Sequence, residues 1–383
     1  MSAPRTIEAE ADRVTTLELF FDLVFVFTIT QLTTVLVHQP NGHGVLQVML
    51  MLGVIWWMYG GYAWMTNFVA PDRANRRLLL VGGMAAFLVL ALSIPGAFAD
   101  SGLAFGLAYA AIIAVHAALF TRHASMDVVR AILGVARYNA GMALLVLAGG
   151  IAGGTAQYVL WAVACLVWIT PKLIDDSGFT IAPGHFVERH GLVIIVAIGE
   201  SVVAIGIGVE GLPVDVGLVG VALLGLALSA QLWWTYFGGD DTRAERAMEE
   251  AAPGRRPQLA IDAFGYAHWL MLLGIIAIAA ALKMVIGHAG ETEALAPALF
   301  LSCGLAAFLA GDVIFRLVLR IGTGRPRAVA AVLALAAIPL GTEVAGAAQI
   351  GAVVLVLGAT IAYERTRARS SGGRVRRRPA RVL

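Results

Sequence analysis

The chain has 383 residues, of which 59% are hydrophobic and 14% are charged, and its mean hydropathy is +0.82. A soluble protein needs polar groups to cover its surface, with about a quarter of its residues charged, so this composition excludes an ordinary soluble globular protein and predicts one that lies in a lipid bilayer. The formal net charge is only +2.

Apolar runs long enough to cross a membrane recur along the whole chain. An α-helix needs about 20 residues to span the hydrocarbon core. This length predicts an all-α bundle of about twelve transmembrane helices, at 17–37, 45–66, 77–98, 102–121, 128–150, 155–172, 190–210, 214–237, 259–287, 295–320, 328–343 and 345–363. The first run contains Glu18 and Asp22 and lacks a small-residue cleavage site, so we expect a permanent span rather than a cleaved signal peptide.

The basic residues indicate the orientation of these spans. Nearly all of them follow even-numbered spans: Arg73, Arg76, Arg77, Arg122, Arg130, Lys172, Arg189, Arg243, Arg246, Arg255, Arg256, Arg320, Arg325 and Arg327. Cytoplasmic loops retain lysine and arginine, so we expect these gaps and both termini to be cytoplasmic. The arginines follow this topology rule and form no groove, so we expect no nucleic-acid partner. The basic tail at 364–383 is expected to be disordered, and either anchors the topology or lies on anionic lipid headgroups.

The two halves of the chain echo each other. Trp56 and Trp57 in the second span match Trp233 and Trp234 in the eighth, and a polar loop ending in paired arginines follows each pair. With six spans in each half, the halves would run parallel, related by an axis along the membrane normal. We therefore predict two six-helix units, 1–170 and 185–363. Duplicated bundles often place a site at the interface between their halves.

Three segments carry a family resemblance. They read LELFFDLVFVFTITQ at 17–31, ERHGL leading into IGES at 188–201, and WWTYF followed by DDTRAE at 233–245. Together they resemble the bacterial low-temperature-requirement A (LtrA) family. The resemblance implies a polytopic inner-membrane protein. It implies no particular reaction or substrate, because the family is known mainly by a growth phenotype.

Ionisable residues inside the membrane are candidates for function, because each is costly to place there. Glu18 and Asp22 lie four residues apart on one helical face, and Gln31 continues toward the same side. Two interpretations stay open for the carboxylates. They form a cation or proton site, or an arginine such as Arg189 or Arg137 clamps them between helices.

Glu200 lies near the bilayer midplane of the seventh predicted span, between Gly199 and Ser201. A glutamate there must be neutral, paired or bound to a cation, and Arg137 is a possible counter-charge. The predicted substrate or ion path consists of Glu18, Asp22, Gln31, Arg137, Glu188, Arg189, Glu200 and Ser201. In the tenth predicted span, Asp312 and Arg316 lie four residues apart and are expected to pair with each other.

A cluster of acidic residues, Asp240, Asp241 and Glu245, follows the eighth span. Such aspartates can hold Mg²⁺ against a diphosphate. Arg243 and Arg246 would neutralise them, however, and an aspartate here is also an ordinary helix N-cap. The chain shows no zinc-ligand spacing, phosphate-binding glycine loop or nucleophile elbow, so we expect no cofactor.

Three functions remain as hypotheses. The first is a secondary transporter for a small solute or ion, with the intramembrane carboxylates coupling to protons or cations. The second is a membrane-embedded, Mg²⁺-dependent enzyme acting on a lipid or isoprenoid. The third is a sensory or stress-adaptation membrane protein.

Overall fold

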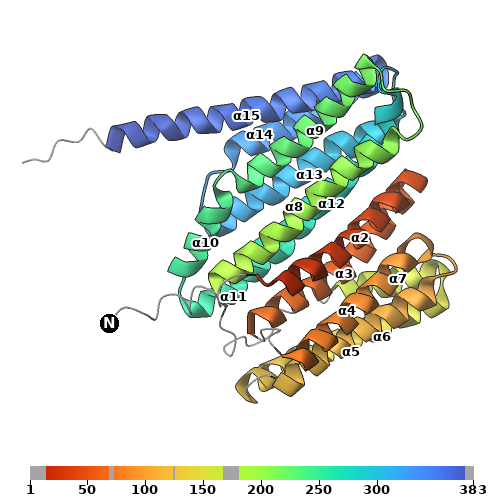
Figure 1. Cartoon of the computed structure of the whole chain (residues 1–383), viewed down its shortest axis with the longest axis vertical. Helices are drawn as coiled ribbons and strands as arrows, with labels where there is room; N and C mark the ends of the chain where they lie inside the picture. Colours follow the sequence, from red (N-terminus) through yellow and green to blue (C-terminus); the bar gives the residue numbers. More distant parts are fainter. Residues whose placement is uncertain (1–13, 69–72, 124–125, 167–180, 376–383) are drawn as a thin grey trace, which may run out of the picture.

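The computed structural model describes residues 14–68, 73–123, 126–166 and 181–375, and within these ranges it is entirely helical and turn structure, without strands. The helices are α2 (Thr16–His38), α3 (Gly42–Phe68), α4 (Ala74–Ser93), α5 (Gly102–His123), α6 (Met126–Ala152), α7 (Gly154–Cys165), α8 (Pro183–Gly208), α9 (Val216–Phe237), α10 (Asp240–Glu250), α11 (Arg256–Leu259), α12 (His268–Val285), α13 (Leu295–Leu319), α14 (Arg325–Ala336) and α15 (Gly346–Val375) (Figure 1). Short 3-10 and π-helical segments extend some of them: η1 (Ile94–Gly96), η3 (Pro253–Arg255), η4 (Ala260–Ala267), η5 (Ile286–His288) and η6 (Leu340–Val344).

Eleven helices among the described residues are long and apolar enough to cross a membrane. They confirm the predicted all-α polytopic bundle. The sixth predicted span, 155–172, corresponds to α7, and its remainder lies outside the described residues. The eleventh predicted span, 328–343, is less regular than expected, because α14 ends at Ala336 and the π-helical segment η6 follows it.

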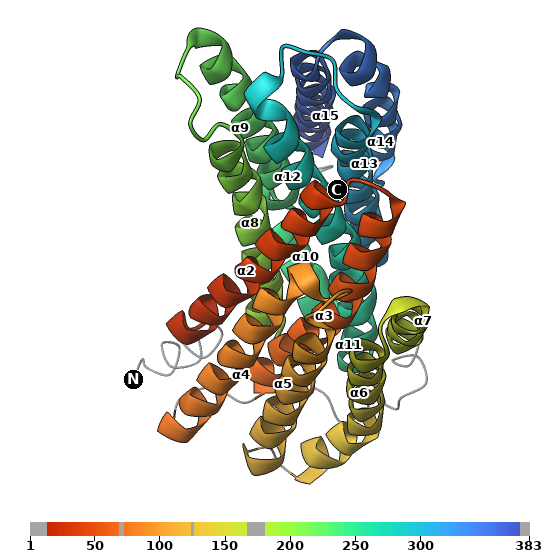
Figure 2. The same ribbon diagram turned by 90° about the vertical axis from the view of Figure 1, so that its right-hand side faces the viewer.

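The helices form two groups that meet along α2 and α3. Helices α2–α7 lie together on one side and α8–α15 on the other (Figures 1 and 2). Helix α2 packs on α3 and α4 of its own group and also on α8 and α12 of the other. The equivalence of the two halves stays a prediction: Trp56 is 2% exposed and Trp233 is 39% exposed, so the matched tryptophans have different surroundings.

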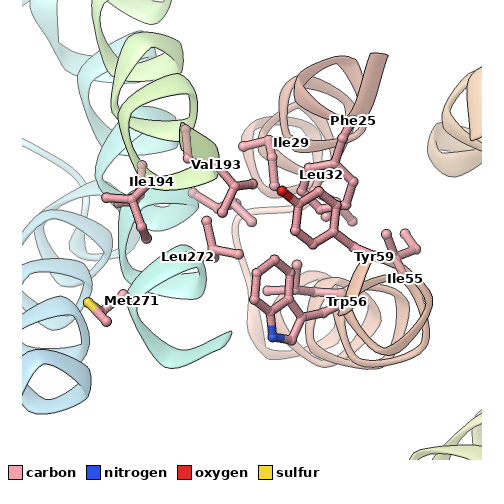
Figure 3. Packing of buried hydrophobic residues seen from close by; sticks show 14 of the residues in the cluster. Phe25, Ile29, Leu32, Ile55, Trp56, Tyr59, Val193, Ile194, Met271 and Leu272 are labelled. Carbon is pink, nitrogen blue, oxygen red and sulfur yellow. The ribbon is translucent and has the colours of Figure 1, made fainter. Parts of the chain in front are cut away.

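The contact between the groups has an apolar core. Phe25 and Ile29 of α2 and Tyr59 of α3 face Val193 of α8 and Leu272 of α12, and all five are buried (Figure 3). Lipid chains are as apolar as these side chains, so association inside a membrane depends on close packing and on hydrogen bonds. Polar contacts at this interface are therefore important for holding the groups together.

Glycines bring α12 and α13 into backbone contact. A Cβ atom on Gly274 would lie 2.5 Å from the carbonyl oxygen of Gly304, and one on Gly304 would lie 2.8 Å from the carbonyl oxygen of Gly274. Two helical turns further along α13, a Cβ atom on Gly311 would lie 2.7 Å from the carbonyl oxygen of Ala267. Small residues at such crossings are typical of packing between membrane helices.

The C-terminal helix continues into the basic tail. Helix α15 reaches Val375, whereas the sequence predicted disorder from residue 364; residues 376–383 lie outside the described residues. Two contacts explain the difference. Arg316 and Arg327 bind Glu364, and the guanidinium of Arg365 lies 3.8 Å from the ring centroid of Trp234.

Candidate functional site

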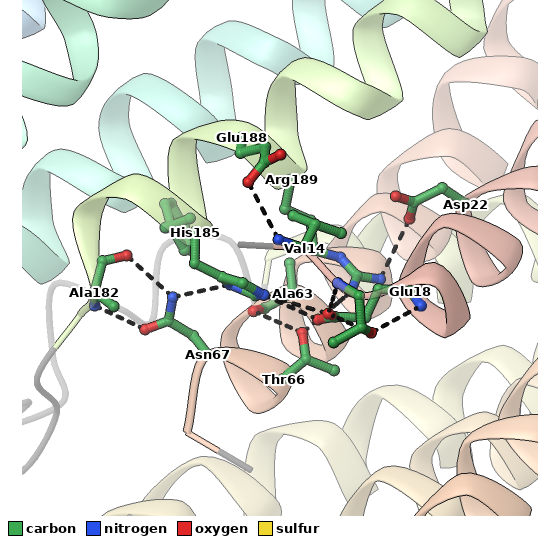
Figure 4. Close-up of polar contacts among 12 residues, drawn as sticks. Val14, Glu18, Asp22, Ala63, Thr66, Asn67, Ala182, His185, Glu188 and Arg189 are labelled. Atoms are coloured by element: carbon green, nitrogen blue, oxygen red, sulfur yellow. Dashed lines mark hydrogen bonds and ion pairs between the residues drawn. The ribbon is translucent and has the colours of Figure 1, made fainter. Parts of the chain in front are cut away.

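A buried arginine joins the two groups at the N-terminal ends of α2 and α8. Arg189 is fully buried, and its Nη1 donates to Glu18 Oε1 at 2.8 Å while its Nη2 donates to Asp22 Oδ1 at 3.3 Å (Figure 4). Charged groups that leave water are stable only when paired in this way. Of the two interpretations of Glu18 and Asp22, the structure contains the contacts of the clamp, with Arg189 as its cation.

Glu18 also starts its own helix. Thr15 is the N-cap of α2: its hydroxyl accepts from the backbone N–H of Glu18 at 3.3 Å, and its backbone N–H donates to Glu18 Oε2 at 2.9 Å. This reciprocal pair is a capping box. One carboxylate oxygen of Glu18 therefore fixes the start of α2, and the other binds α8.

Sequence reasoning missed the polar neighbours of this clamp. Asn67, at the end of α3, accepts from the backbone N–H of Ala182 at 2.8 Å, which turns its amide nitrogen toward Nδ1 of His185 at 3.3 Å. We therefore assign Nδ1 as the acceptor and Nε2 as the protonated nitrogen, which donates to Glu18 Oε1 at 3.1 Å. Thr66 accepts from Arg189 Nη1 at 3.2 Å.

The clamp has more negative than positive charge. Glu18 and Asp22 supply two carboxylates, Arg189 supplies one cation, and the assigned tautomer of His185 is neutral. Tyr59 donates to Asp22 Oδ1 at 3.1 Å, but Asp22 Oδ2 has no hydrogen-bond partner among the described residues. One carboxylate oxygen at this interface is therefore available to a proton or a cation.

Glu200 forms a second contact between α2 and α8. Its Oε2 accepts from the Thr30 hydroxyl at 2.5 Å, and the Glu200 side chain is 3% exposed. Arg189 and Glu200 differ by about 20° around α8, so both face α2. The two helices run parallel, because the early residues of each are in contact and so are the later ones. The clamp and the Thr30–Glu200 contact are separated by roughly 12–18 Å along the helices.

The structure does not bring every predicted path residue to this interface. Arg137 is exposed, and its Nη2 donates to the hydroxyl of neighbouring Tyr138 at 3.1 Å, so it pairs neither with Glu200 nor with Glu18. Glu188 is also exposed and accepts from the backbone N–H of Val14 at 3.2 Å. Gln31 is half-buried. The remaining predicted residue, Ser201, is fully buried, and no described residue bonds its hydroxyl.

A second group of buried ions joins α10, α13, α14 and α15. It contains the predicted Asp312–Arg316 ion pair, but as its longest contact. Arg316 Nε lies 3.8 Å from Asp312, but it donates to Asp240 at 2.7 Å, and Arg316 Nη1 donates to Glu364 at 2.9 Å. Asp312 is bonded by Arg327 from the next helix. The i,i+4 spacing therefore gives only the longer contact, because better-placed partners come from other helices.

The acidic segment after α9 is engaged in this second group. Asp240 contacts Arg243, Arg316 and Arg327, so arginines surround the first carboxylate of the predicted Mg²⁺ set. Asp241 and Glu245 are both half-buried on α10. The described residues contain no group of three or more His, Cys, Asp or Glu side chains that could hold a metal ion.

Histidines inside the bundle form hydrogen bonds with neighbouring helices and with their own helix. His268 Nδ1 donates to the carbonyl oxygen of Ala263 at 2.9 Å, so its Nε2 accepts from the Tyr236 hydroxyl at 2.9 Å. His116 lies 3.0 Å from the carbonyl oxygen of Gly61. The π-helical turn η4 also contributes to the interface, because the carbonyl oxygen of Gly265 accepts from Trp56 Nε1 at 2.9 Å.

In the part of the chain that the structure describes, eleven helices long and apolar enough to cross a membrane, with paired ions in the interior, define a multi-pass integral membrane protein. The sequence profile of the family described as bacterial low temperature requirement A protein (LtrA) matches residues 13–362, and the chain belongs to this family. It is 27% identical over 317 residues to an uncharacterized protein of Rhizobium meliloti (strain 1021), covering 77% of this chain and 75% of that protein. No solved structure matches the chain.

Proposed function

We propose that this protein is a secondary transporter that moves a small solute or ion along the interface between α2–α7 and α8–α15. Glu200 is the carboxylate that takes up the coupling proton or cation. An ionisable side chain at membrane depth is expensive to keep there, which favours a functional role over packing.

This proposal rests on the polar groups that surround the Glu200 carboxylate. Its hydrogen-bond partner is the Thr30 hydroxyl, and no arginine forms an ion pair with it among the described residues. Lys283, in the last turn of α12, is the cation that interacts with it electrostatically. The neighbouring hydroxyl of Ser201 is buried and has no hydrogen-bond partner among the described residues. Carboxylate and hydroxyl oxygens suit a proton or a hard cation. Glu18 and Asp22 differ from Glu200, because Arg189 holds them and their first role is to join the helices.

The experiment measures solute flux in proteoliposomes under an imposed pH or Na⁺ gradient, across a panel of solutes. Glu200→Gln keeps the size of the side chain and its hydrogen bonding but removes its charge, so we expect gradient-driven flux to fall to that of empty liposomes. Glu188→Gln is the matched control, since it removes an exposed carboxylate from the same helix. Thermal unfolding of each variant shows whether the fold is intact.

Flux that is unchanged in a stable Glu200→Gln protein would reject the coupling role. Thr30→Val should produce a smaller defect than Glu200→Gln, because it removes one hydrogen bond and leaves the carboxylate. A Thr30→Val protein with no flux and a normal melting temperature would show instead that the hydroxyl is the essential group.

The orientation in the membrane is part of the same proposal. The arginine-bearing gaps favour a bacterial inner-membrane protein with both termini in the cytoplasm. A reporter that is active only outside the cytoplasm should be inactive at the C-terminus and active in the turn at 211–215. A bright C-terminal fusion would contradict this orientation. The predicted contact of the basic tail with anionic headgroups belongs to the same arrangement.

A further inference from the structure

A cavity lies between α10, the η3–α11 turn and the C-terminal end of α13. Its volume is about 530 Å³, within the range of small-molecule sites, roughly 300–1,000 Å³. Arg246 of α10, Arg255 of η3 and Arg320 after α13 line it from three elements. Its remaining wall is largely apolar and includes Leu259 and Val318.

The three arginines, Arg246, Arg255 and Arg320, form no ion pair with a carboxylate among the described residues. A fourth lining arginine, Arg243, is paired with Asp240, and Glu250 is the acidic residue of the lining. The cavity therefore has an excess of positive charge that no ion pair within the described residues balances.

Contacts outside the cavity hold its walls in place. Arg256 Nη2 donates to the carbonyl oxygen of Glu249 at 2.9 Å, and its Nε donates to that of Ala251 at 3.2 Å, which fixes the turn after α10. On α10 itself, Ala244 and Met248 are buried, so the opposite face, with Arg246, is directed outward.

Arg320 lies at a position where glycine would fit more easily. It follows the last turn of α13 in the left-handed conformation, with φ of 57°. Helices commonly end with glycine in this conformation, because a Cβ atom is unfavourable there. The arginine at this position therefore has a strained backbone that glycine would relieve, and it is one of the residues that line the cavity.

The location of the cavity indicates its ligand. The apolar span of α13 ends at Leu319, so the lining crosses from the hydrocarbon edge to the level of lipid headgroups. Guanidinium groups match phosphate oxygens in geometry and charge. We propose that this cavity binds the phosphate head group of an anionic lipid, with the arginines on the phosphate and the acyl chains leaving along Leu259 and Val318.

The test uses the full chain purified in a neutral detergent. Dioctanoyl phosphatidylglycerol, dioctanoyl phosphatidylcholine and inorganic phosphate are titrated separately, and binding is followed by native mass spectrometry and by the shift in melting temperature. We expect phosphatidylglycerol to bind at least about tenfold more tightly than either other probe, a difference of about 1.4 kcal/mol.

The double variant Arg246→Gln/Arg255→Gln should weaken phosphatidylglycerol binding by at least about tenfold, again about 1.4 kcal/mol. Arg325→Gln is the matched control, because it removes an exposed arginine a few residues from Arg320 but outside the cavity lining. Arg320→Gly removes a lining guanidinium where glycine suits the backbone, so it should weaken binding without lowering the melting temperature.

Equal binding of the two lipids by the unmodified protein would overturn the proposal. So would phosphatidylglycerol binding that is unchanged in the cavity variants. Inorganic phosphate that binds as tightly as phosphatidylglycerol would also reject the lipid, and would make a soluble phosphate compound the ligand.

Discussion

Replacing Arg189 with glutamine removes the only cation of the clamp that lies within hydrogen-bonding distance of both Glu18 and Asp22 among the described residues. Both carboxylates are at most 1% exposed, so water cannot take the place of the arginine. Breaking a buried ion pair by removing one partner costs about 3–5 kcal/mol. We expect a loss of this size in the free energy of unfolding, measured by SDS titration in mixed micelles with tryptophan fluorescence.

Two further variants make this prediction sharp. Arg137→Gln removes an exposed arginine and should change the unfolding free energy by less than about 0.5 kcal/mol. Glu18→Gln combined with Arg189→Gln should lose less than the sum of the single losses, with a coupling of about 1–3 kcal/mol, because the second change removes one of the two stranded carboxylates. Additive losses, or a loss below about 1 kcal/mol for Arg189→Gln, would refute the clamp.

Three more perturbations test the packing and the periphery. Gly274→Val would place its Cβ atom 2.5 Å from the carbonyl oxygen of Gly304, so we expect a loss of about 1–3 kcal/mol, whereas Gly220→Ala meets no atom within 4 Å and should be tolerated; equal losses would contradict the close crossing. Trp56→Phe removes one buried hydrogen bond between the two groups and should lower the unfolding free energy by about 1 kcal/mol, and no change would mean that the bond does not hold them. Burial between the spans raises the pKa of Glu293 from its ordinary 4.5 to about 7, so the folded state favours the protonated form; stability should fall as the pH rises from 4.5 to 7 and be constant above, by at most about 1–2 kcal/mol because water screens the partly exposed side chain. Melting curves across this range should lose that slope in Glu293→Gln, and an identical slope in both proteins would reject the assignment.

The spans could be predicted because hydropathy is a local property of the chain. The predicted boundaries of most helices agree with the structure within a few residues. Helix α8 is an exception: it starts at Pro183, seven residues before the predicted start at 190, since proline at the first turn begins a helix without losing a hydrogen bond. The longer helix includes His185, which lies in the gap between the sixth and seventh predicted spans.

The partners of the buried charges were harder to predict. The sequence offers two arginines, Arg189 and Arg137, as the cation that pairs with Glu18 and Asp22, and nothing in it favours one over the other. The choice depends on how each helix is rotated about its axis, and an apolar span gives little information on that rotation. For Glu18 a signal was present: the spacing of Thr15 and Glu18 is that of a capping box, which predicts a carboxylate at a helix start.

The clamp also has a consequence for how the protein is made. Glu18 and Arg189 are separated by 171 positions in the chain, so the ribosome completes α2 long before the arginine exists. At 5–20 residues per second this interval is roughly 10–30 s. During that time α2 lies at the membrane with two carboxylates that lack their cation; an Asp at the centre of a span adds roughly 3 kcal/mol to insertion, which is an upper bound for Asp22 near the start of α2. Stable insertion of α2 therefore depends on the synthesis of α8. A chain truncated before α8 should be a substrate for membrane proteases.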